Sequence, residues 1–287
     1  MPELPEVEVV KQSLEKYILN KKLLKIVVKN NNLRYPVPKN ISKKLSNLKV
    51  LEIKRISKYV LLKFQDELFL LFHLGMSGTL HLIRSKKNLQ NTNLSFYYVK
   101  NLPKKHNHLF FNFKNFSIIF NDPRRFGFIK LIKGDSNLNN YFKKLGPDPF
   151  EIDFNFEYVK KYLFKKKKNI KNTLIDQKFI SGIGNIYASE ILNYSKINPF
   201  KFSCEIKNKE IIKIIYYTKR VLSRAIKKGG TTINNFLSVK GSQGSYQKEF
   251  HAYDRENKSC KNKLCLGTIN KVNISNRSTY MCNICQK

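Results

Sequence analysis

Long apolar runs are missing from this sequence of 287 residues. No stretch approaches the roughly 20 consecutive apolar residues that a membrane-spanning helix needs. No basic segment precedes a hydrophobic one near the N-terminus, as it does in a secretory signal. We therefore expect a protein that stays in the cytoplasm and has no membrane partner.

Acidic residues are scarce: 20 Asp and Glu stand against 55 Lys and Arg, which gives a formal net charge of +35. Such an excess attracts polyanions, so the partner classes to consider are DNA, RNA and anionic membranes. Part of the charge reflects composition, because Lys, Asn and Ile crowd the whole chain, as in "KKKKNIKN". An AT-rich coding bias produces this pattern, so individual positions carry more information about function than the net charge.

The five cysteines argue against a disulfide framework, because no signal peptide precedes them and four lie near the C-terminus. Their spacing, C-x4-C-x16-C-x2-C, lets two close pairs each form one edge of a tetrahedron around Zn²⁺. These four are Cys260, Cys265, Cys282 and Cys285. Four thiolates leave no position for water, so we expect one structural Zn²⁺ without a catalytic role. The fifth, Cys204, is expected to be a small apolar core residue.

The periodicity of apolar residues divides the chain into segments. Residues 3–19 repeat apolar positions at helical spacing, residues 23–133 alternate short β-branched and aromatic runs with polar turns, and residues 155–230 return to helical spacing. This pattern predicts an α+β protein. The predicted segments are an N-terminal helix with a β-sandwich (1–133), a linker (134–154), a helical domain (155–240), and a loop followed by a metal-held hairpin (241–287).

Three motifs resemble ligand contacts but also have ordinary structural readings. In "SGIGNIYASE", Gly182 and Gly184 precede a helix, so exposed backbone N–H groups could bind a phosphate, or the glycines could simply connect two helices. In "NDPRRFGF", the turn could enter a DNA duplex, or Phe126 could be tucked inward. In "HLGMSG", the default expectation for Met76 is core filling.

Taken together, several motifs carry a family resemblance: "MPELPEV", "SKYVLL", "HLGMSG", "NDPRRFG", "GIGNIYASE", "GGTT" and the cysteine hairpin, in unbroken order from Met1 to Lys287. The chain resembles the formamidopyrimidine-DNA glycosylases, bacterial enzymes that excise 8-oxoguanine and ring-opened purines. The resemblance implies an N-terminal β-sandwich with an N-terminal helix, a helix-two-turn-helix (H2TH) domain and a zinc-bound β-hairpin. It also implies a monomer that acts on damaged double-stranded DNA in the bacterial cytoplasm, at the nucleoid.

The resemblance implies four catalytic residues. Once Met1 is removed, Pro2 is the nucleophile, and Glu3 is the general acid. Lys58 contacts the phosphate beside the lesion and assists elimination, and Arg277 aids δ-elimination. A terminal amine suits this chemistry because its pKa, about 8, lies below the value of about 10.4 for lysine, so more of it is neutral at pH 7. The Schiff base on Pro2 is then an electron sink for β-elimination.

The resemblance also implies contacts with DNA. The corresponding residues are His73, Met76, His106, Arg124, Phe126, Lys166 and Asn185. His73 and Asn185 contact phosphates, and His106 and Lys166 are further DNA contacts. The other three fill the void when the damaged nucleotide flips out, with Arg124 facing the orphaned cytosine. Residues 238–250 correspond to a loop that closes over the everted base.

The sequence departs from the family pattern at two positions. The first cysteine pair is C-x4-C where C-x2-C is common, and Asn276 stands where glycine is frequent before Arg277. Asn tolerates positive φ, so the turn can still form.

Three alternative functions fit parts of the sequence. An endonuclease VIII-like glycosylase would remove oxidised pyrimidines with the same nucleophile. A DNA-binding protein that has lost catalysis would also carry the positive net charge. The presence of Pro2, Glu3, Lys58 and Arg277 argues against this alternative. A basic zinc-ribbon RNA binder would account for the charge and the cysteines but not for the N-terminus.

Overall fold

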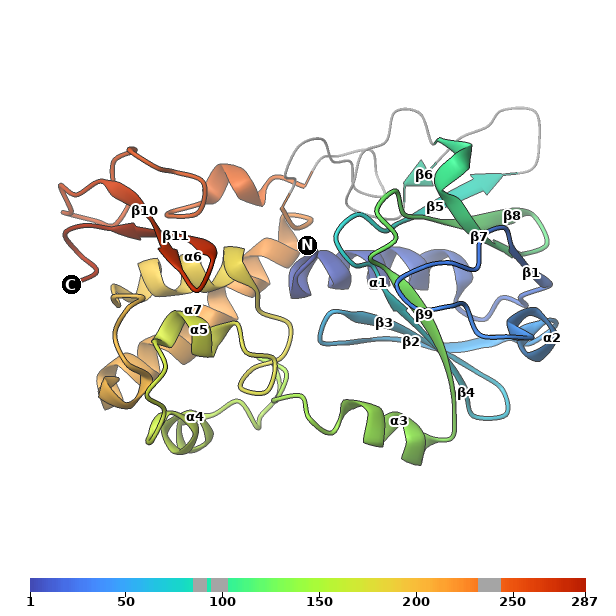
Figure 1. The fold of residues 1–287 in the computed structure, drawn as a ribbon, viewed down its shortest axis with the longest axis horizontal. Helices are drawn as coiled ribbons and strands as arrows, with labels where there is room; N and C mark the ends of the chain where they lie inside the picture. The colour runs from blue at the N-terminus through green and yellow to red at the C-terminus, as the bar shows by residue number, and fades with distance from the viewer. Residues whose placement is uncertain (85–91, 94–102, 232–243) are drawn as a thin grey trace. The chain divides into compact units, whose positions relative to one another are not determined.

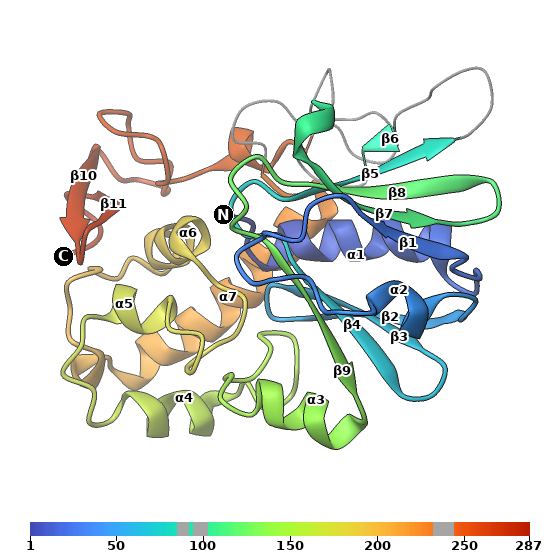
Figure 2. The ribbon, with the colours of Figure 1, turned by 45° about the vertical axis from the view of Figure 1, so that its right-hand side comes forward.

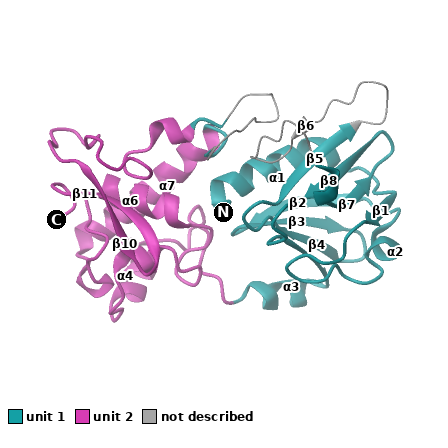
Figure 3. Cartoon of the chain, turned by 45° about the horizontal axis from the view of Figure 1, so that its top comes forward, with its two compact units in different colours: residues 1–143, 228–245 teal, residues 144–227, 246–287 magenta. Residues whose placement is uncertain are grey.

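A computed structural model describes residues 1–84, 92–93, 103–231 and 244–287 of the chain (Figure 1). The chain divides into two compact units, and each is described by itself (Figure 3). Unit 1 contains residues 1–143 and 228–245, and unit 2 contains residues 144–227 and 246–287. Unit 1 therefore includes a short segment that follows most of unit 2 in the sequence.

Unit 1 begins with the predicted amphipathic helix, α1 (Leu4–Ile18). Glu3 is its N-cap residue, and the Glu3 N–H donates to Oε2 of Glu6 at 2.9 Å, which satisfies one of the backbone donors that a helix start leaves unpaired. Pro5 in the first turn needs no such partner. The apolar positions that predicted the helix are all buried: Val7, Val10, Leu14 and Ile18.

Two antiparallel sheets make up most of unit 1 (Figure 2). The four-stranded sheet has the order β2 (Val50–Ile56), β3 (Tyr59–Phe64), β4 (Leu68–His73) and β9 (Phe128–Lys133). The five-stranded sheet has the order β1 (Lys25–Val28), β7 (Asn107–Asn112), β8 (Phe116–Asn121), β5 (Thr79–Arg84) and β6 (Thr92–Asn93). Two short helices lie in the connections, α2 (Ile41–Leu45) and η1 (Lys104–His106).

The alternation of strand side chains places the core of unit 1 between the sheets. Val60 and Leu62 of β3 join the core that also contains α1 and residues of the five-stranded sheet such as Phe120. Leu61 points to the other face of its sheet and packs with Leu138 of α3 (Asp135–Phe142). The sequence pattern describes residues 134–154 as a linker, and α3 lies within that segment.

Unit 2 contains the helical segments and a C-terminal hairpin. Its helices are α4 (Phe156–Leu163), α5 (Ile170–Leu174), α6 (Asn185–Ser195) and α7 (Asn208–Lys227), with single turns η2 (Ser203–Glu205) and η3 (Tyr246–Glu249). The side chains of Asn155 and Asn169 accept backbone N–H groups and so start α4 and α5. The hairpin pairs β10 (Ile269–Ile274) with β11 (Arg277–Cys282).

The predicted fold class is confirmed: a helix and β-sheets come first, then helices, then a cysteine-bearing hairpin. The prediction for Cys204 is wrong, because this residue is exposed. It lies in the single turn η2, where the neighbouring Ser203 is buried and donates its hydroxyl to the Lys168 carbonyl at 2.8 Å, so Cys204 faces outward. Of the predicted loop 238–250, residues 238–243 lie outside the described residues. No helix in the described parts of the chain is long and apolar enough to cross a membrane.

Histidine burial in unit 1 predicts a pH-dependent stability. Burial lowers the pKa of His81 on β5 to about 4, and its Nε2 lies 2.9 Å from Oγ1 of Thr79. An unfolded histidine titrates near 6.5, so between pH 6.5 and 4 the unfolded chain binds more protons and stability falls as the pH falls. The pH dependence of the unfolding free energy in His81→Gln should be weaker by up to about 1.4 kcal/mol per pH unit.

Thermal or denaturant unfolding between pH 4 and 7 measures this difference. Thr79→Val is the matched control, since it removes the hydroxyl beside the ring at 2.9 Å but keeps the titrating group. Equal pH slopes for wild type and His81→Gln would contradict the burial effect.

Candidate functional site

The chain of unit 1 becomes buried directly after Met1. Met1 is 51% exposed, Pro2 is buried and Glu3 is 3% exposed. Burial lowers the pKa of the Met1 α-amino group below its ordinary value of 8.0. Glu3 and Glu6 oppose this effect, whereas the cationic groups of Lys58 and Arg124 add to it. A terminal amine at this place is therefore neutral more often than an exposed one.

Lys58 lies in the two-residue turn between β2 and β3 and is only 6% exposed. Its neighbour Ser57 has a φ of +54°, so the turn is tight. Arg55 supports this turn: its Nη1 donates to the Ser57 carbonyl at 3.3 Å, and its Nε lies 2.9 Å from Oε2 of Glu8 on α1. This ion pair is largely buried, so it connects the Lys58 turn to the helix that carries the N-terminus.

Glu6 connects the N-terminus to the "GGTT" segment, a contact that sequence reasoning missed. Its Oε1 accepts the backbone N–H and the hydroxyl of Thr231, both at 2.9 Å. Gly230 has a φ of +78°, and a Cβ there would lie 3.1 Å from Oε1 of Glu6. A larger residue at 230 would be strained and crowded, which accounts for the second glycine of "GGTT".

His73 ends β4 as a neutral ring. Burial, followed by the charges of Lys58 and Arg34, lowers its pKa to about 4. Its Nδ1 accepts the Gly75 N–H at 3.1 Å, so the ring hydrogen resides on Nε2. The ring stacks on Phe128 with centroids 5.1 Å apart. His73 is therefore arranged to donate one hydrogen bond through Nε2 at neutral pH.

The structure brings the predicted void-filling residues onto two adjoining turns. Met76 is 40% exposed and Phe126 is 41% exposed, so neither fills a core. The expectation of core filling for Met76 and the inward alternative for Phe126 are therefore wrong. The guanidinium of Arg124 lies 4.6 Å from the Phe126 ring centroid. The turns touch, since a Cβ on Gly75 would be 2.3 Å from the Phe126 carbonyl carbon.

The other two weaker DNA-contact candidates lie on the surfaces of their own units. His106 is half-buried at the end of η1, and its carbonyl accepts the Asp122 N–H at 3.0 Å. Lys166 is exposed in unit 2, with its Nζ 4.8 Å from the Tyr162 ring centroid. These contacts of His106 and Lys166 do not indicate a catalytic role.

In unit 2, Asn185 is held at the start of α6 by two neighbours. Its Oδ1 accepts from Nζ of Lys171 at 2.8 Å, and its Nδ2 donates to the Ser278 carbonyl at 2.8 Å. Lys171 is 1% exposed, and its Nζ also lies 2.7 Å from Oγ1 of Thr279. Sequence reasoning missed Lys171, because it lies just after a lysine-rich run that looks solvent-exposed.

The expectation of an exposed Gly182 N–H is wrong. Gly182 and Gly184 are both buried, and the Gly182 N–H donates to Oε1 of Gln177 at 2.8 Å. Gln177 also donates to the Ile183 carbonyl at 2.7 Å, so this side chain organises the glycine segment. Any phosphate contact at this helix start must therefore involve other groups than the Gly182 N–H.

Arg277 is exposed and directly follows the turn of the hairpin. Ser275 and Asn276 have φ values of +50° and +60°, which is the conformation of a type I′ hairpin turn. Asn276 therefore performs the conformational role of the glycine that is frequent there. Oγ of Ser275 accepts from Nδ2 of Asn172 at 2.7 Å, which ties the turn to α5.

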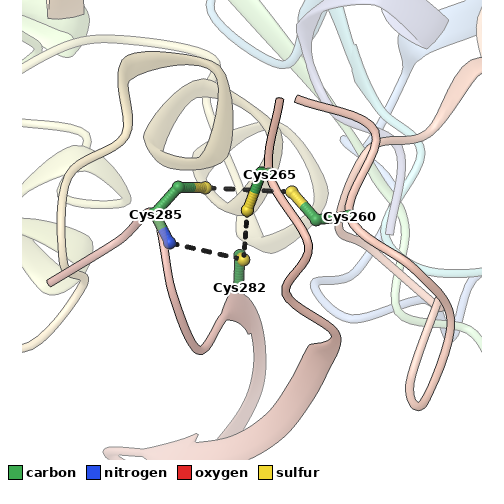
Figure 4. Close-up of side chains that lie close together, drawn as sticks. All are labelled: Cys260, Cys265, Cys282 and Cys285. Carbon is green, nitrogen blue, oxygen red and sulfur yellow. Dashed lines mark hydrogen bonds between the residues drawn. The ribbon is translucent and has the colours of Figure 1, made fainter. Parts of the chain in front are cut away.

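The four C-terminal cysteines form a cluster that fits a metal ion (Figure 4). Their sulfur atoms all lie within 4.8 Å of one another, with 3.8 Å between Cys260 and Cys285 and 3.5 Å between Cys265 and Cys282. Sulfurs bound about 2.3 Å from one tetrahedral ion would be about 3.8 Å apart. The longer first spacing, C-x4-C, therefore still lets all four thiols converge.

Comparisons with known proteins agree with this arrangement. The family model for the formamidopyrimidine-DNA glycosylase N-terminal domain matches residues 1–129, and the model for the H2TH domain of the same family matches residues 145–236. Formamidopyrimidine-DNA glycosylases of Wolbachia sp. subsp. Brugia malayi (strain TRS) and Rickettsia bellii (strain OSU 85-389) are 39% and 38% identical, over the whole of both chains.

Solved structures agree as well. The Lactococcus lactis Fpg in complex with DNA containing an abasic site is 31% identical, with a TM-score of 0.86 over 99% of both chains. The wild-type Lactococcus lactis enzyme with DNA containing N7-benzyl-Fapy-dG is 31% identical in sequence, with a TM-score of 0.85 over 100% of both chains. These matches define the class, DNA glycosylases with abasic-site lyase activity. Within that class, the chain belongs to the formamidopyrimidine-DNA glycosylase family, as the sequence resemblance predicted.

The cysteine cluster predicts one bound metal ion per chain. Elemental mass spectrometry of the purified protein should detect one equivalent, and Cys282→Ser should lose it, because the buried Cys282 is one of the four converging thiols. Amide hydrogen exchange in β10 and β11 should accelerate in that variant. Cys204→Ser, at the exposed cysteine, is the matched control and should keep the metal. Equal metal content in wild type and Cys282→Ser would refute the site.

Proposed function

We propose that this protein is a base-excision-repair glycosylase that removes oxidised purines, 8-oxoguanine and formamidopyrimidines, from duplex DNA and cleaves the abasic strand by β,δ-elimination. The observation that carries the proposal is the buried N-terminus, where burial and the cations of Lys58 and Arg124 lower the pKa of the terminal amine. The names of the relatives and the damaged DNA in the Lactococcus lactis complexes support the substrate class.

Pro2 is the proposed nucleophile. Once Met1 is removed, its secondary amine becomes the terminal group, and Pro2 is more deeply buried than Met1. The nitrogen lone pair forms a bond to the sugar C1′ as the bond from C1′ to the base breaks. The base leaves with the electron pair of the broken bond. The nitrogen then loses its proton and forms the C1′=N bond as the C1′–O4′ bond of the sugar breaks and O4′ takes up a proton. The iminium stays cationic because its nitrogen has no further hydrogen to lose, and this cation accepts the electrons of β-elimination.

Glu3 and Lys58 are the proposed partners of this nucleophile. Glu3 directly follows Pro2, is 3% exposed, and acts as general acid toward the sugar or the leaving base. Lys58 is 6% exposed and acts on the phosphate beside the lesion and in elimination. Arg277, exposed at the start of β11 in unit 2, binds flanking phosphates and aids δ-elimination.

The remaining site residues position the DNA without reading its sequence. His73 donates a hydrogen bond from a neutral ring to a phosphate, and Asn185, His106 and Lys166 are further contacts. The exposed side chains on the two adjoining turns fill the space that the flipped nucleotide leaves. These side chains are Met76, Arg124 and Phe126.

We further propose that the metal is one structural Zn²⁺, that the protein works as a monomer and that it works in the cytoplasm. Four thiolates around a tetrahedral site are the ligand set typical of structural zinc. Cys260, Cys265, Cys282 and Cys285 would hold the ion and thereby the hairpin that carries Arg277. An ion closed in by four protein ligands takes no part in the reaction.

Borohydride trapping tests the nucleophile. We incubate the protein with a duplex that contains 8-oxoguanine opposite cytosine, add borohydride, and map the cross-link by mass spectrometry. We expect a reduced adduct on Pro2, and none on molecules that retain Met1. Glu3→Gln should slow adduct formation on the order of 100-fold or more, the range of general acid catalysis.

Lysine variants provide the matched pair for the same experiment. Lys58→Met should slow trapping, whereas Lys54→Met, on the same strand pair with a 57% exposed side chain, should not. An adduct only with oxidised pyrimidines would favour the endonuclease VIII-like alternative. DNA binding without any adduct would favour a catalytically silent binder.

A further inference from the structure

Asp122 is a fully buried carboxyl group that neither the sequence pattern nor the proposed chemistry uses. It directly follows β8 and is 0% exposed. Its Oδ2 accepts the Gly127 N–H at 2.7 Å, and its Oδ1 accepts a short hydrogen bond from the Ser77 hydroxyl. Two different turns therefore meet at one side chain, since Ser77 follows Met76 and Gly127 follows Phe126.

Ser77 extends this connection to the arginine. Its Oγ lies 3.2 Å from the Arg124 backbone nitrogen, so the hydroxyl accepts from Arg124 while it donates to Asp122. The backbone of Asp122 is anchored as well. Its N–H donates to the His106 carbonyl at 3.0 Å, and its carbonyl accepts from the Arg125 N–H at 3.3 Å. The buried carboxyl group thus has a fixed position from which it holds both turns.

The backbones of the two turns also touch. Gly75 has a φ of +61°, and a Cβ there would lie 2.4 Å from the Gly127 nitrogen. The approach requires glycine at 75 and leaves no room for a water molecule between the turns at this point. Polar links and close backbone contact therefore define one arrangement of the two turns.

We infer that Asp122 and Ser77 are positioning residues that hold the Met76 turn and the Arg124–Phe126 turn as one preordered wedge for insertion into damaged DNA. The inference rests on the proposed function. Three exposed side chains can enter one base-pair step only if their spacing is set beforehand. If the turns moved independently, each insertion would have to order them, which costs conformational entropy. Nucleotide flipping would then be less favourable.

A merely structural role makes a different prediction. Loss of stability would lower every activity of the protein in proportion to the folded fraction. Loss of the preordered wedge lowers only reactions that require insertion into a base stack. A single-stranded abasic oligonucleotide has no opposite base and no stack to fill, so its cleavage reports the chemistry and the folded fraction alone.

Ser77→Ala is the first variant to test, because it removes the hydroxyl that joins Asp122 to Arg124 and leaves the Asp122–Gly127 bond in place. We expect excision of 8-oxoguanine from a duplex to fall about five- to tenfold relative to the single-strand abasic cleavage rate, the lower end of the effect of losing the two hydrogen bonds that this hydroxyl makes. The fluorescence rise of 2-aminopurine placed beside the orphaned base should shrink in the same variant. Ser77→Thr, which keeps a hydroxyl, should restore both.

Ser117→Ala is the matched control. Ser117 lies on β8, the strand that leads to Asp122, and its half-buried hydroxyl donates to Oδ1 of Asn112 at 2.9 Å, away from both turns. It should leave the ratio of duplex to single-strand activity unchanged. Equal losses on both substrates in Ser77→Ala, or no loss on either, would overturn the inference. Failure of the wild type to excise or cross-link would instead overturn the proposed function.

Discussion

The carboxylate of Glu6 joins two segments that lie far apart in the sequence. It accepts the N–H of Glu3 on one oxygen and two donors of Thr231 on the other. The start of α1 is thereby tied to Thr231 of the "GGTT" segment and does not fray in water, as most chain ends do. Burial lowers the pKa of the Met1 α-amino group, and the charge of Lys58 lowers it further.

A buried cation has the corresponding role in unit 2. Lys171 donates to Asn185 and Thr279, and Asn185 in turn donates to the Ser278 carbonyl. These bonds fix the strand that begins at Arg277 against the start of α6. A lysine with 1% exposure is costly to bury unless its hydrogens find partners, and here the partners come from two different elements. The position of Arg277 thus depends on the helices as much as on the cysteine cluster.

Much of the fold was predictable because its signals are local. The helical spacing of Val7, Val10 and Leu14 predicted α1, and the short β-branched and aromatic runs within residues 23–133 predicted strands where β2, β3 and β4 lie. The short helix α3 escaped prediction because it has few apolar positions of its own and is stabilised by packing of Leu138. Cys204 was misassigned because a lone apolar residue carries no periodicity that reports its orientation.

The sequence by itself determined the spacing of the four cysteines, the helix that opens the chain and the family motifs, since each is a relation among residues close in the chain. The tertiary structure alone decided that Asp122 holds two turns, that Lys171 is buried and that the Gly182 N–H is occupied. Asp122 and Ser77 are separated by 45 positions, and Lys171 and Thr279 by 108. Such pairs meet only through strand register and helix packing, which no local pattern encodes.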